Sequence, residues 1–557
     1  MTRRSFVLAG LFAVLFGLGW WAGRSGARGD LYANLDLFVE VLHKVSDNYV
    51  DPVEPKKLID GALKGMMRGL DPYSQFLDSR AYGNLQSVTQ GSFGGIGVVV
   101  GVRDNYPTVI SPIEGTPAWR AGLHSGDIIV EIEGHSSLGL TIDEVADRLR
   151  GPQGTRVAIK VRREGEDQDQ DYELERELIV TRSVPYSFLV ERGIGYLRLS
   201  SFSEQTAVEV REAVESLRAA GARSLVLDLR LNPGGLLDQA VDVAEQFLPR
   251  NSLVVYTQGR QRGQDNRYYA RDAHPLVQWP LVVLVDNGSA SAAEIVAGAL
   301  QDLDRGLLVG RTTFGKGSVQ SVFPLRDRSG ALKLTTALYY TPSGRSIHRT
   351  VRDTSGAADE DDDGGSNPHL APRDSSRRPV FHTAAGRTVY GGGGITPDVV
   401  VIPDSLPPLV QRAEVRSLPF RFANRWVNSH PEPASSGNGQ PGRPGGTAAP
   451  PEPAPWDEFV AFLRAEKFAF TDAELAVLRP VLERALRREL ARRRGGDAAA
   501  VRVALEGDPV FQRALEVLRR ARGPREVFAL AGVAPTGPDH ARGHRTPSAG
   551  HDRASRN

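Results

Sequence analysis

The spacing of apolar residues changes along the chain and predicts a helical start, a strand-rich region and an α/β centre. Between residues 31 and 85, apolar side chains recur at helical spacing, as in Leu35, Val39, Leu42 and Val45 and again in Ile59, Ala62, Leu63 and Met66. Residues 88–167 form short runs of strand type that glycine turns interrupt. From 183 to 350, strand-like and helix-like runs alternate, which predicts an α/β domain. We expect the first helices to support this domain by packing, with an oligomerisation or lid element as the alternative.

Three later stretches interrupt or end this pattern. Residues 353–378 carry the acidic run Asp359–Asp363 among Gly, Ser and Pro, which predicts a disordered, solvated insertion. Residues 430–455 are rich in Pro, Gly and Ser and are typical of a linker, and the tail 533–557 is expected to be disordered.

A small helical domain is predicted between the linker and the tail, over 456–532. Thr471 and Glu474 form a capping-box pattern. Apolar positions at helical spacing follow it: Leu475, Leu478, Leu482, Leu486 and Leu490. The basic face of this domain is read as solvated, with partner binding as the alternative.

The N-terminus, residues 1–27, reads as a targeting segment. Arg3 and Arg4 precede an uncharged apolar run from Ser5 to Gly23, which is long enough to span a bilayer. The same segment also fits a cleaved signal peptide with a site near Ala27, or a twin-arginine signal. We expect the body of the protein to be extracytoplasmic, either anchored to the inner or plasma membrane or exported to the periplasm. A buried N-terminal core helix is the alternative.

Composition excludes several kinds of chemistry. The 557 residues contain no cysteine, which excludes disulfides, cysteine-ligated metal centres and a thiol nucleophile. Lys and Arg number 68 against 67 Asp and Glu, a net charge of +1, so no basic field points to nucleic acid. We expect neither a metal nor a cofactor. Only about eight of the basic residues are lysines, so a lysine inside a tight motif carries information.

Ser291 is the candidate nucleophile. It follows a buried-strand pattern, Leu281–Val285, and a turn, Asp286–Ser289, and it stands at the start of a helical run. A sharp turn between strand and helix is a setting that nucleophilic serines use, because the helix N-terminus favours developing negative charge. The same residues, from Ser291 to Glu294, also fit an ordinary helix-capping box.

A glycine-flanked lysine supplies the candidate base. Lys316 lies between two glycines, and a desolvated lysine can lose its proton whereas arginine cannot. Gln320 lies four residues on and is expected on the same face, where it can orient the amine. Gly234 and Gly235, between a strand and a helix, offer backbone N–H groups that with Ala292 can form an oxyanion hole. A plain tight turn is the alternative for that loop.

A peptide-binding module is predicted over residues 88–167. A Gly-rich loop leads into a strand, and Thr141 and Glu144 cap a following helix, an order that resembles a circularly permuted bacterial PDZ domain. A free strand edge and converging backbone N–H groups suit an extended peptide with a free carboxylate. A structural β domain with an ordinary glycine turn is the alternative. The expected peptide-binding residues are Phe93, Gly94, Gly95, Ile96, Gly97 and Val98, with Ile142, Val145 and Leu149 on the helix.

Together these motifs resemble the carboxyl-terminal processing (tail-specific) serine peptidases. The match includes Asn232–Gly235, Gly288–Glu294 and Phe314–Gln320, and extends to Tyr340–Ile347 and Gly394–Asp398. The resemblance covers about 31–403 and implies a crotonase-like α/β peptidase core over 183–350 and 380–403 with an inserted PDZ domain. It implies Ser291 as nucleophile, Lys316 as general base and Gln320 as the residue that positions Lys316. It does not account for the acidic insertion or the C-terminal helical domain.

The resemblance predicts an endopeptidase that binds the apolar C-terminus of a protein or peptide substrate and cleaves near it. The alternatives are a catalytically silent PDZ adaptor on a peptidase-like core and a trypsin-like peptidase, whose Gly-Asp-Ser-Gly-Gly motif is missing from the sequence. A homo-oligomer and an adaptor partner are both left open, and contact with a membrane is expected only through the N-terminal segment.

Overall fold

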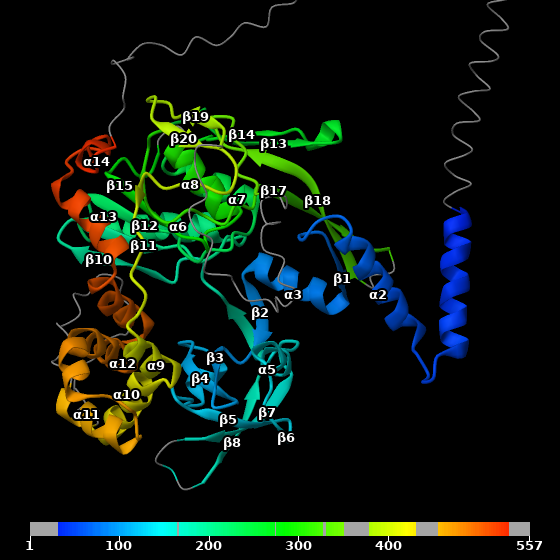
Figure 1. Cartoon of the computed structure of the whole chain (residues 1–557), viewed down its shortest axis with the longest axis horizontal. Coiled ribbons are helices and arrows are strands. Elements are labelled where there is room, and N and C mark those ends of the chain that lie inside the picture. Colours follow the sequence, from blue (N-terminus) through cyan, green and yellow to red (C-terminus); the bar gives the residue numbers. More distant parts are fainter. Residues whose placement is uncertain are drawn as a thin grey trace, which may run out of the picture. The chain divides into compact units, whose positions relative to one another are not determined.

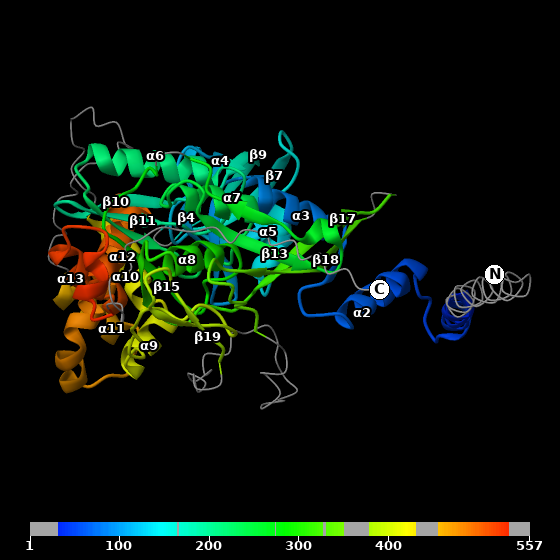
Figure 2. The same cartoon turned by 90° about the horizontal axis from the view of Figure 1, so that it is seen from above.

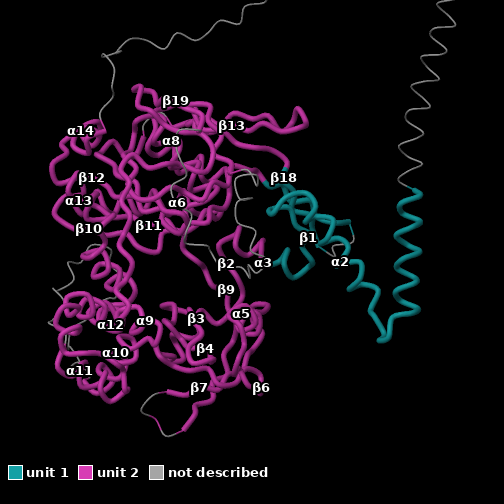
Figure 3. Tube along the Cα trace, in the orientation of Figure 1, with its two compact units in different colours: residues 1–83, 320–335 teal, residues 84–319, 336–557 magenta. Residues whose placement is uncertain are grey.

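The computed structural model describes residues 32–163, 166, 168–272, 275–326, 330–349, 378–430 and 455–533. The predicted targeting segment 1–27 therefore lies outside the described residues. So do the predicted insertion 353–378, linker 430–455 and tail 533–557, except for their end residues 378, 430, 455 and 533. The chain divides into two compact units, residues 1–83 with 320–335 and residues 84–319 with 336–557 (Figure 3). Within the described residues, no helix combines the length and apolar character needed to cross a membrane.

The smaller unit contains helices, the strand β1 and parts of two later strands, β17 and β18. A helix over 32–48 is followed by α2 (Pro55–Arg68) and β1 (Gln75–Asp78). β1 runs antiparallel to the beginning of β18 (Gly330–Tyr340), with Asp78 opposite Gly330. The sequence pattern predicted only helix here. The Asp71 carboxylate accepts hydrogen bonds from the N–H groups of Tyr73 and Ser74, and this turn ends the helical stretch.

A six-stranded sheet forms the centre of the larger unit, in the order β10-β11-β12-β15-β16-β21 (Figure 1). β10 is antiparallel to β11, and the remaining neighbours are parallel. The strands are β10 (Tyr186–Glu191), β11 (Ile194–Arg198), β12 (Ser224–Asp228), β15 (Leu281–Val285), β16 (Leu307–Gly310) and β21 (Val399–Val400).

Helices cover both faces of this sheet (Figure 2). Leu225 and Leu227 pack among α6 (Thr206–Ala219), α7 (Leu237–Glu245) and α8 (Ala292–Asp302). Val226, between them, belongs to a second cluster with α13 (Pro509–Arg520) and α14 (Glu526–Leu530) on the other face. The period of two in the strand thus determines which helix layer each side chain meets.

Further strands flank this core. β13 (Leu253–Gly259) pairs with β14 (Arg267–Tyr269) and with the end of β18, and β17 (Ser318–Pro324) also pairs with β18. A hairpin of β19 (Val380–His382) and β20 (Thr388–Tyr390) follows, and the 3-10 helix η1 (Arg262–Gln264) lies between β13 and β14.

A separate β domain stands between α3 (Ser79–Gln90) and β10. Its sheet has the order β3-β4-β5-β7-β8, with β6 paired to β5, while β2 pairs with β9. Its core contains Val109, Ile129 and Ile159. The elements are β2 (Ser92–Gly95), β3 (Val98–Arg103), β4 (Tyr106–Pro112), α4 (Pro117–Arg120), β5 (Ile128–Ile132), β6 (His135–Ser136), α5 (Ile142–Leu149), β7 (Arg156–Arg162), β8 (Gln170–Glu175) and β9 (Glu177–Val180).

The remaining helices form the C-terminal region. They are α9 (Pro408–Val415), α10 (Leu418–Ser429), α11 (Trp456–Ala465) and α12 (Asp472–Glu506), followed by α13 and α14. The capping box predicted at Thr471 and Glu474 is present at the start of α12. Most leucines of the predicted helical face are buried there, including Leu482 and Leu486.

Candidate active site

Ser291 stands at a strained turn between β15 and α8. Its backbone has φ 55° and ψ −116°, a conformation that a non-glycine residue adopts only when its surroundings enforce it. The nearby Ser289 is fully buried, and its hydroxyl donates to the Leu229 carbonyl at 2.8 Å. Ser289 therefore stabilises the turn, while Ser291 is only partly buried at the helix start.

A single buried carboxylate connects the Ser291 turn to the Lys316 loop. Oε2 of Glu294 accepts the N–H of Ser291 and the N–H of Lys316, both at 2.9 Å. Its Oε1 accepts the N–H of Gly315 at 2.8 Å and the hydroxyl of Thr313. Burial raises the pKa of the Glu294 carboxyl, and these donors oppose that rise because they favour the charged form.

Tyr339 makes a second connection between the same two segments. Its side chain is 1% exposed, and its hydroxyl lies 3.1 Å from the carbonyl oxygen of Ser291 and 2.5 Å from that of Lys316. The main chains at Ser291 and Lys316, 25 positions apart in sequence, are therefore side by side in space. The sequence interpretation treated Glu294 only as a helix cap and did not single out Tyr339.

The Gly234–Gly235 loop packs against the Ser291 turn. A Cβ added at Gly234, whose φ is 97°, would lie 2.7 Å from the Cβ of Ser291 and 2.9 Å from the nitrogen of Ala292. The N–H of Gly234 donates to the Asn232 side chain at 2.9 Å. Gly235, with φ 149°, is held by a bridge to Phe202. The structure thus brings Gly234 and Ala292 together, and the side chain of Asn232 already uses the N–H of Gly234.

Gln320 lies on β17 and belongs to the smaller unit. Its amide nitrogen is 3.3 Å from the hydroxyl oxygen of Thr335, which in turn is 3.2 Å from the carboxylate of Asp71. β17 begins at Ser318, so Lys316 precedes the strand. The two side chains therefore do not share one regular element, and the role of Gln320 stays a prediction.

Some of the predicted peptide-binding residues lie in the apolar core of the β domain, and others lie on or near the strands β2 and β3 or at its surface. Ile96, Val145 and Leu149 are at most 5% exposed and belong to its apolar core, whereas Ile142 is 53% exposed. Phe93, Gly94 and Gly95 lie on β2, and Val98 begins β3. Gly97, with φ 75°, joins the two strands, and Thr116 donates to its carbonyl at 2.9 Å.

The edge of β3 is the feature that suits an extended peptide. β3 is the first strand of its sheet and pairs on one side with β4, and α5 contacts it. The Gly94 carbonyl accepts the N–H of Gly151, just beyond α5, at 3.1 Å. This hydrogen bond connects the Gly-rich segment before β3 to the end of α5, the two parts that would enclose the end of a peptide.

Charged side chains reinforce the base of the Gly-Gly loop. Asp228, at the end of β12, is fully buried and pairs with Arg198 at 2.9 Å and Arg230 at 2.7 Å. Burial alone would raise the pKa of Asp228, but the two arginines lower it overall. Tyr196 also donates to this carboxylate at 2.9 Å.

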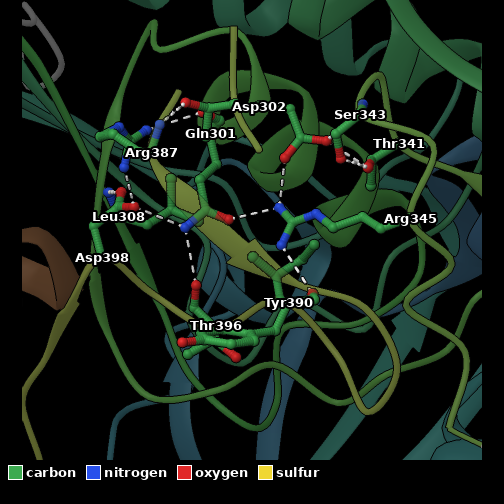
Figure 4. A network of polar contacts seen from close by, with 12 residues as sticks. Gln301, Asp302, Leu308, Thr341, Ser343, Arg345, Arg387, Tyr390, Thr396 and Asp398 are labelled. Carbon is green, nitrogen blue, oxygen red and sulfur yellow. Dashed lines mark hydrogen bonds and ion pairs between the residues drawn. The ribbon is translucent and has the colours of Figure 1, made fainter. Parts of the chain in front are cut away.

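The far end of α8 is held by a buried polar network (Figure 4). Asp302 and Arg345 form an ion pair at 2.6 Å in which both side chains are fully buried. Gln301 accepts from Arg345 at 2.7 Å and donates to Asp398 at 2.9 Å, and Arg387 also pairs with Asp398. The helix that presents Ser291 is thus fixed at both ends. Across the described residues, no cluster of three or more His, Asp and Glu side chains could hold a metal ion.

An α/β core that presents a strained serine beside a glycine-flanked lysine, joined to a β domain with an open strand edge, defines the class of PDZ-containing peptidases. Family models agree: residues 193–355 match peptidase family S41, residues 108–163 match a PDZ domain, and residues 25–81 match the activating protease CtpB N-terminal domain.

Curated relatives bear the same description. A carboxy-terminal-processing protease of Bartonella bacilliformis is 42% identical over 320 residues, which cover 57% of this chain and 73% of the relative. A carboxyl-terminal-processing protease of Synechocystis sp. is 36% identical over 372 residues, 62% of this chain and 86% of the relative. The carboxy-terminal processing protease CtpA of Bacillus subtilis is 35% identical over 327 residues, 58% of this chain and 69% of the relative. The chain belongs to the family of carboxyl-terminal processing proteases, and both the resemblance and the expected fold class are confirmed.

Proposed function

We propose that this protein is a serine endopeptidase with a Ser–Lys dyad that captures the C-terminus of a protein substrate in its PDZ domain and cleaves near it. Ser291 is the nucleophile and Lys316 the general base, with Gln320 positioning the lysine. The observation that carries this assignment is the Glu294 carboxylate, because one of its oxygens accepts the N–H groups of both Ser291 and Lys316 at 2.9 Å.

The chemistry requires a neutral lysine. The Ser291 hydroxyl attacks the scissile carbonyl while its proton passes to Nζ of Lys316, and the lysine then returns the proton to the leaving amine. Water hydrolyses the resulting ester. Lys316 is partly buried, and desolvation favours the neutral amine. The oxyanion is assigned to the N–H groups of Gly235 and Ala292, because the Gly234 N–H donates to Asn232.

Substrate capture is assigned to the edge of β3. A peptide added there as a strand would place its free carboxylate at the Gly94–Gly97 loop, and Ile142 would face the peptide from the start of α5. This capture favours substrates with an apolar C-terminus. Export or membrane anchoring through residues 1–27 remains a prediction from the sequence, as do homo-oligomers and an adaptor partner.

The test compares three variants of the full chain on an unfolded protein with an apolar C-terminus. Ser291→Ala and Lys316→Arg are both expected to lose turnover, since loss of general-base catalysis alone costs on the order of 10²–10⁴-fold, while substrate binding persists. Ser289→Ala should lower stability and keep the turnover per folded molecule. Turnover of Ser291→Ala near that of the wild type would leave the silent adaptor or another serine as the explanation. An active Lys316→Arg would refute the lysine base, because a guanidinium stays protonated.

A further inference from the structure

The C-terminal helices form two groups joined by one long helix. α9, α10, α11 and residues 472–495 of α12 share an apolar core, and we refer to this part as the C-terminal bundle. At Gly496 the backbone leaves the helical conformation (φ 73°, ψ −174°). Beyond that kink, Leu505 of α12 joins α13 and α14 on the face of the peptidase sheet. The matched family models lie within residues 25–355, so this region is an addition to them.

The second group anchors the region to the peptidase core. The Phe511 ring meets Tyr196 edge-on at 5.8 Å between ring centres. The guanidinium of Arg502 lies 3.8 Å from the centre of the Phe188 ring and donates to the Leu189 carbonyl at 2.8 Å. Together with the apolar cluster on β12, β15 and β16, these contacts attach the chain beyond the kink to the peptidase core.

The C-terminal bundle and the kink contact the PDZ domain. The Ser111 hydroxyl donates to the Asp497 carboxylate at 3.1 Å, directly after the kink. The guanidinium of Arg103 lies 3.6 Å from the centre of the Phe420 ring on α10. Asn424 packs so closely on Gly126 that an added Cβ would lie 2.6 Å from its amide nitrogen. Figure 1 shows α9, α10 and α12 beside β3 and β4 of the PDZ domain.

This interface is buried but polar. Phe420 and Asn424 are each 6% exposed. Burial lowers the pKa of Arg103, while Glu489 of the bundle opposes that effect. Burial also lowers the pKa of Arg493, which faces Asp127 of the PDZ domain. Few contacts suffice to keep such an interface closed, because both partners belong to one chain and meet at a high effective concentration.

We propose that the C-terminal bundle is a docking surface for the chain's own PDZ domain and that it fixes the distance between the captured substrate tail and Ser291. The inference rests on the proposed function. A PDZ domain held only by its linkers would present the tail over a range of distances, whereas a docked one presents it at a single distance. Docking therefore determines how far from the substrate's C-terminus cleavage occurs.

The test uses full-length variants and maps the product ends. Arg103→Ala removes the contact with Phe420 from the PDZ side of the interface. Asp497→Ala removes the contact with Ser111 from the other side, together with the ion pair that Asp497 forms with Arg492. Arg162→Ala is the matched control, because this PDZ arginine pairs with Asp169 at the surface. An unfolded protein with a free apolar C-terminus is digested, and mass spectrometry locates every cut. We expect cuts at a narrow set of distances from the C-terminus for the wild type and for Arg162→Ala. The two docking variants should give a broader set, with total turnover of the same order.

Hydrogen exchange of the backbone amides at positions 424 and 497 shows whether the interface has opened. Thermal unfolding shows whether each variant is folded. An unchanged set of cuts in a folded variant with an opened interface would overturn the proposal, as would equal broadening in Arg162→Ala. Loss of turnover on a short peptide without a captured tail would also overturn it, because the contacts would then serve the peptidase core. If Arg103→Ala fails to fold, Phe420→Leu replaces it. Failure of the proposed function is recognised separately, as activity in Ser291→Ala.

Discussion

At the scale of single residues, Glu294 caps its own helix and also holds the loop that carries Lys316. Its carboxylate accepts four donors, from Ser291, Thr313, Gly315 and Lys316, and it is fully buried. An exposed capping glutamate such as Glu474 serves only its own helix start. Glu294 therefore positions the main chain of the proposed nucleophile and that of the proposed base at the same time.

Glu294→Gln is expected to lose both stability and turnover. The amide retains one acceptor oxygen, so in either orientation its NH₂ group would face at least one N–H donor in a buried site. Each unsatisfied buried group costs about 1–3 kcal/mol. We expect kcat to fall more than KM rises, because the reacting groups would lose their alignment. Steady-state kinetics and urea unfolding measure the two effects. Glu474→Gln is the control and should change neither by much; a Glu294→Gln variant with wild-type kcat would refute the positioning role.

Ser291 and Lys316 could be selected from the sequence as candidates because each lies in a short local motif. The Ser291 turn follows a recognisable buried strand, and Lys316 is a rare lysine between glycines. Tyr339 could not be predicted in this way, because its hydroxyl meets the two carbonyls only after β18 has folded against the core. The contacts of Glu294 with the Lys316 loop could not be predicted either. A capping pattern describes only a few consecutive residues and says nothing of a distant loop.

At the scale of elements, α13 connects the C-terminal region to the loop beside Ser291. Asp508 caps the helix by accepting from the N–H groups of Val510 and Phe511 at 3.0 and 3.2 Å. The same carboxylate accepts from Arg230, two residues before Asn232. The sequence predicted one helical domain over 456–532, but periodicity reports only that a helix has an apolar face. It does not report that α13 covers the peptidase sheet while α11 packs in a separate bundle.

Asp508→Ala is expected to destabilise the protein by about 0.5–2 kcal/mol, the range for losing an N-cap. Because Arg230 also loses a partner beside the Gly-Gly loop, we expect turnover to fall as well. Chemical unfolding and kcat report the two losses. Glu516→Ala, which removes a partner of Arg513 on the exposed side of the same helix, should stay within about 0.5 kcal/mol of the wild type. Equal effects of the two substitutions would show that the cap and the contact with Arg230 contribute nothing.

At the scale of the whole molecule, the proposed capture and the proposed cleavage belong to different domains, so the two steps can be tested separately by changing the substrate alone. In the proposed capture, backbone N–H groups of the Gly94–Gly97 loop donate hydrogen bonds to the substrate's C-terminal carboxylate. A neutral amide at the same place accepts weaker hydrogen bonds. A hydrogen bond to a charged group contributes about 1.5–3 kcal/mol, and 1.4 kcal/mol corresponds to tenfold.

We therefore expect a substrate with an amidated C-terminus to be cleaved with kcat/KM lower by about tenfold or more. Competition with a short free-acid peptide of apolar sequence should slow the unmodified substrate and leave the amidated one nearly unaffected. Parallel progress curves for the two substrates measure both effects. Equal kcat/KM for the free-acid and amidated forms would remove the PDZ domain from substrate selection.

Because β1 pairs with the start of β18, it must wait for its partner while the chain is being synthesised. Phe76 and Leu77 of β1 are buried, and their partner residues are Leu332 and Ala331. A ribosome that adds about 5–20 residues per second reaches this partner only on the order of ten seconds or more after it has made β1. During that interval β1 has an unpaired apolar edge, which chaperones can bind before β18 pairs with it. A fragment that ends before residue 330 keeps this edge for good, so aggregation of such fragments would reflect a missing strand partner.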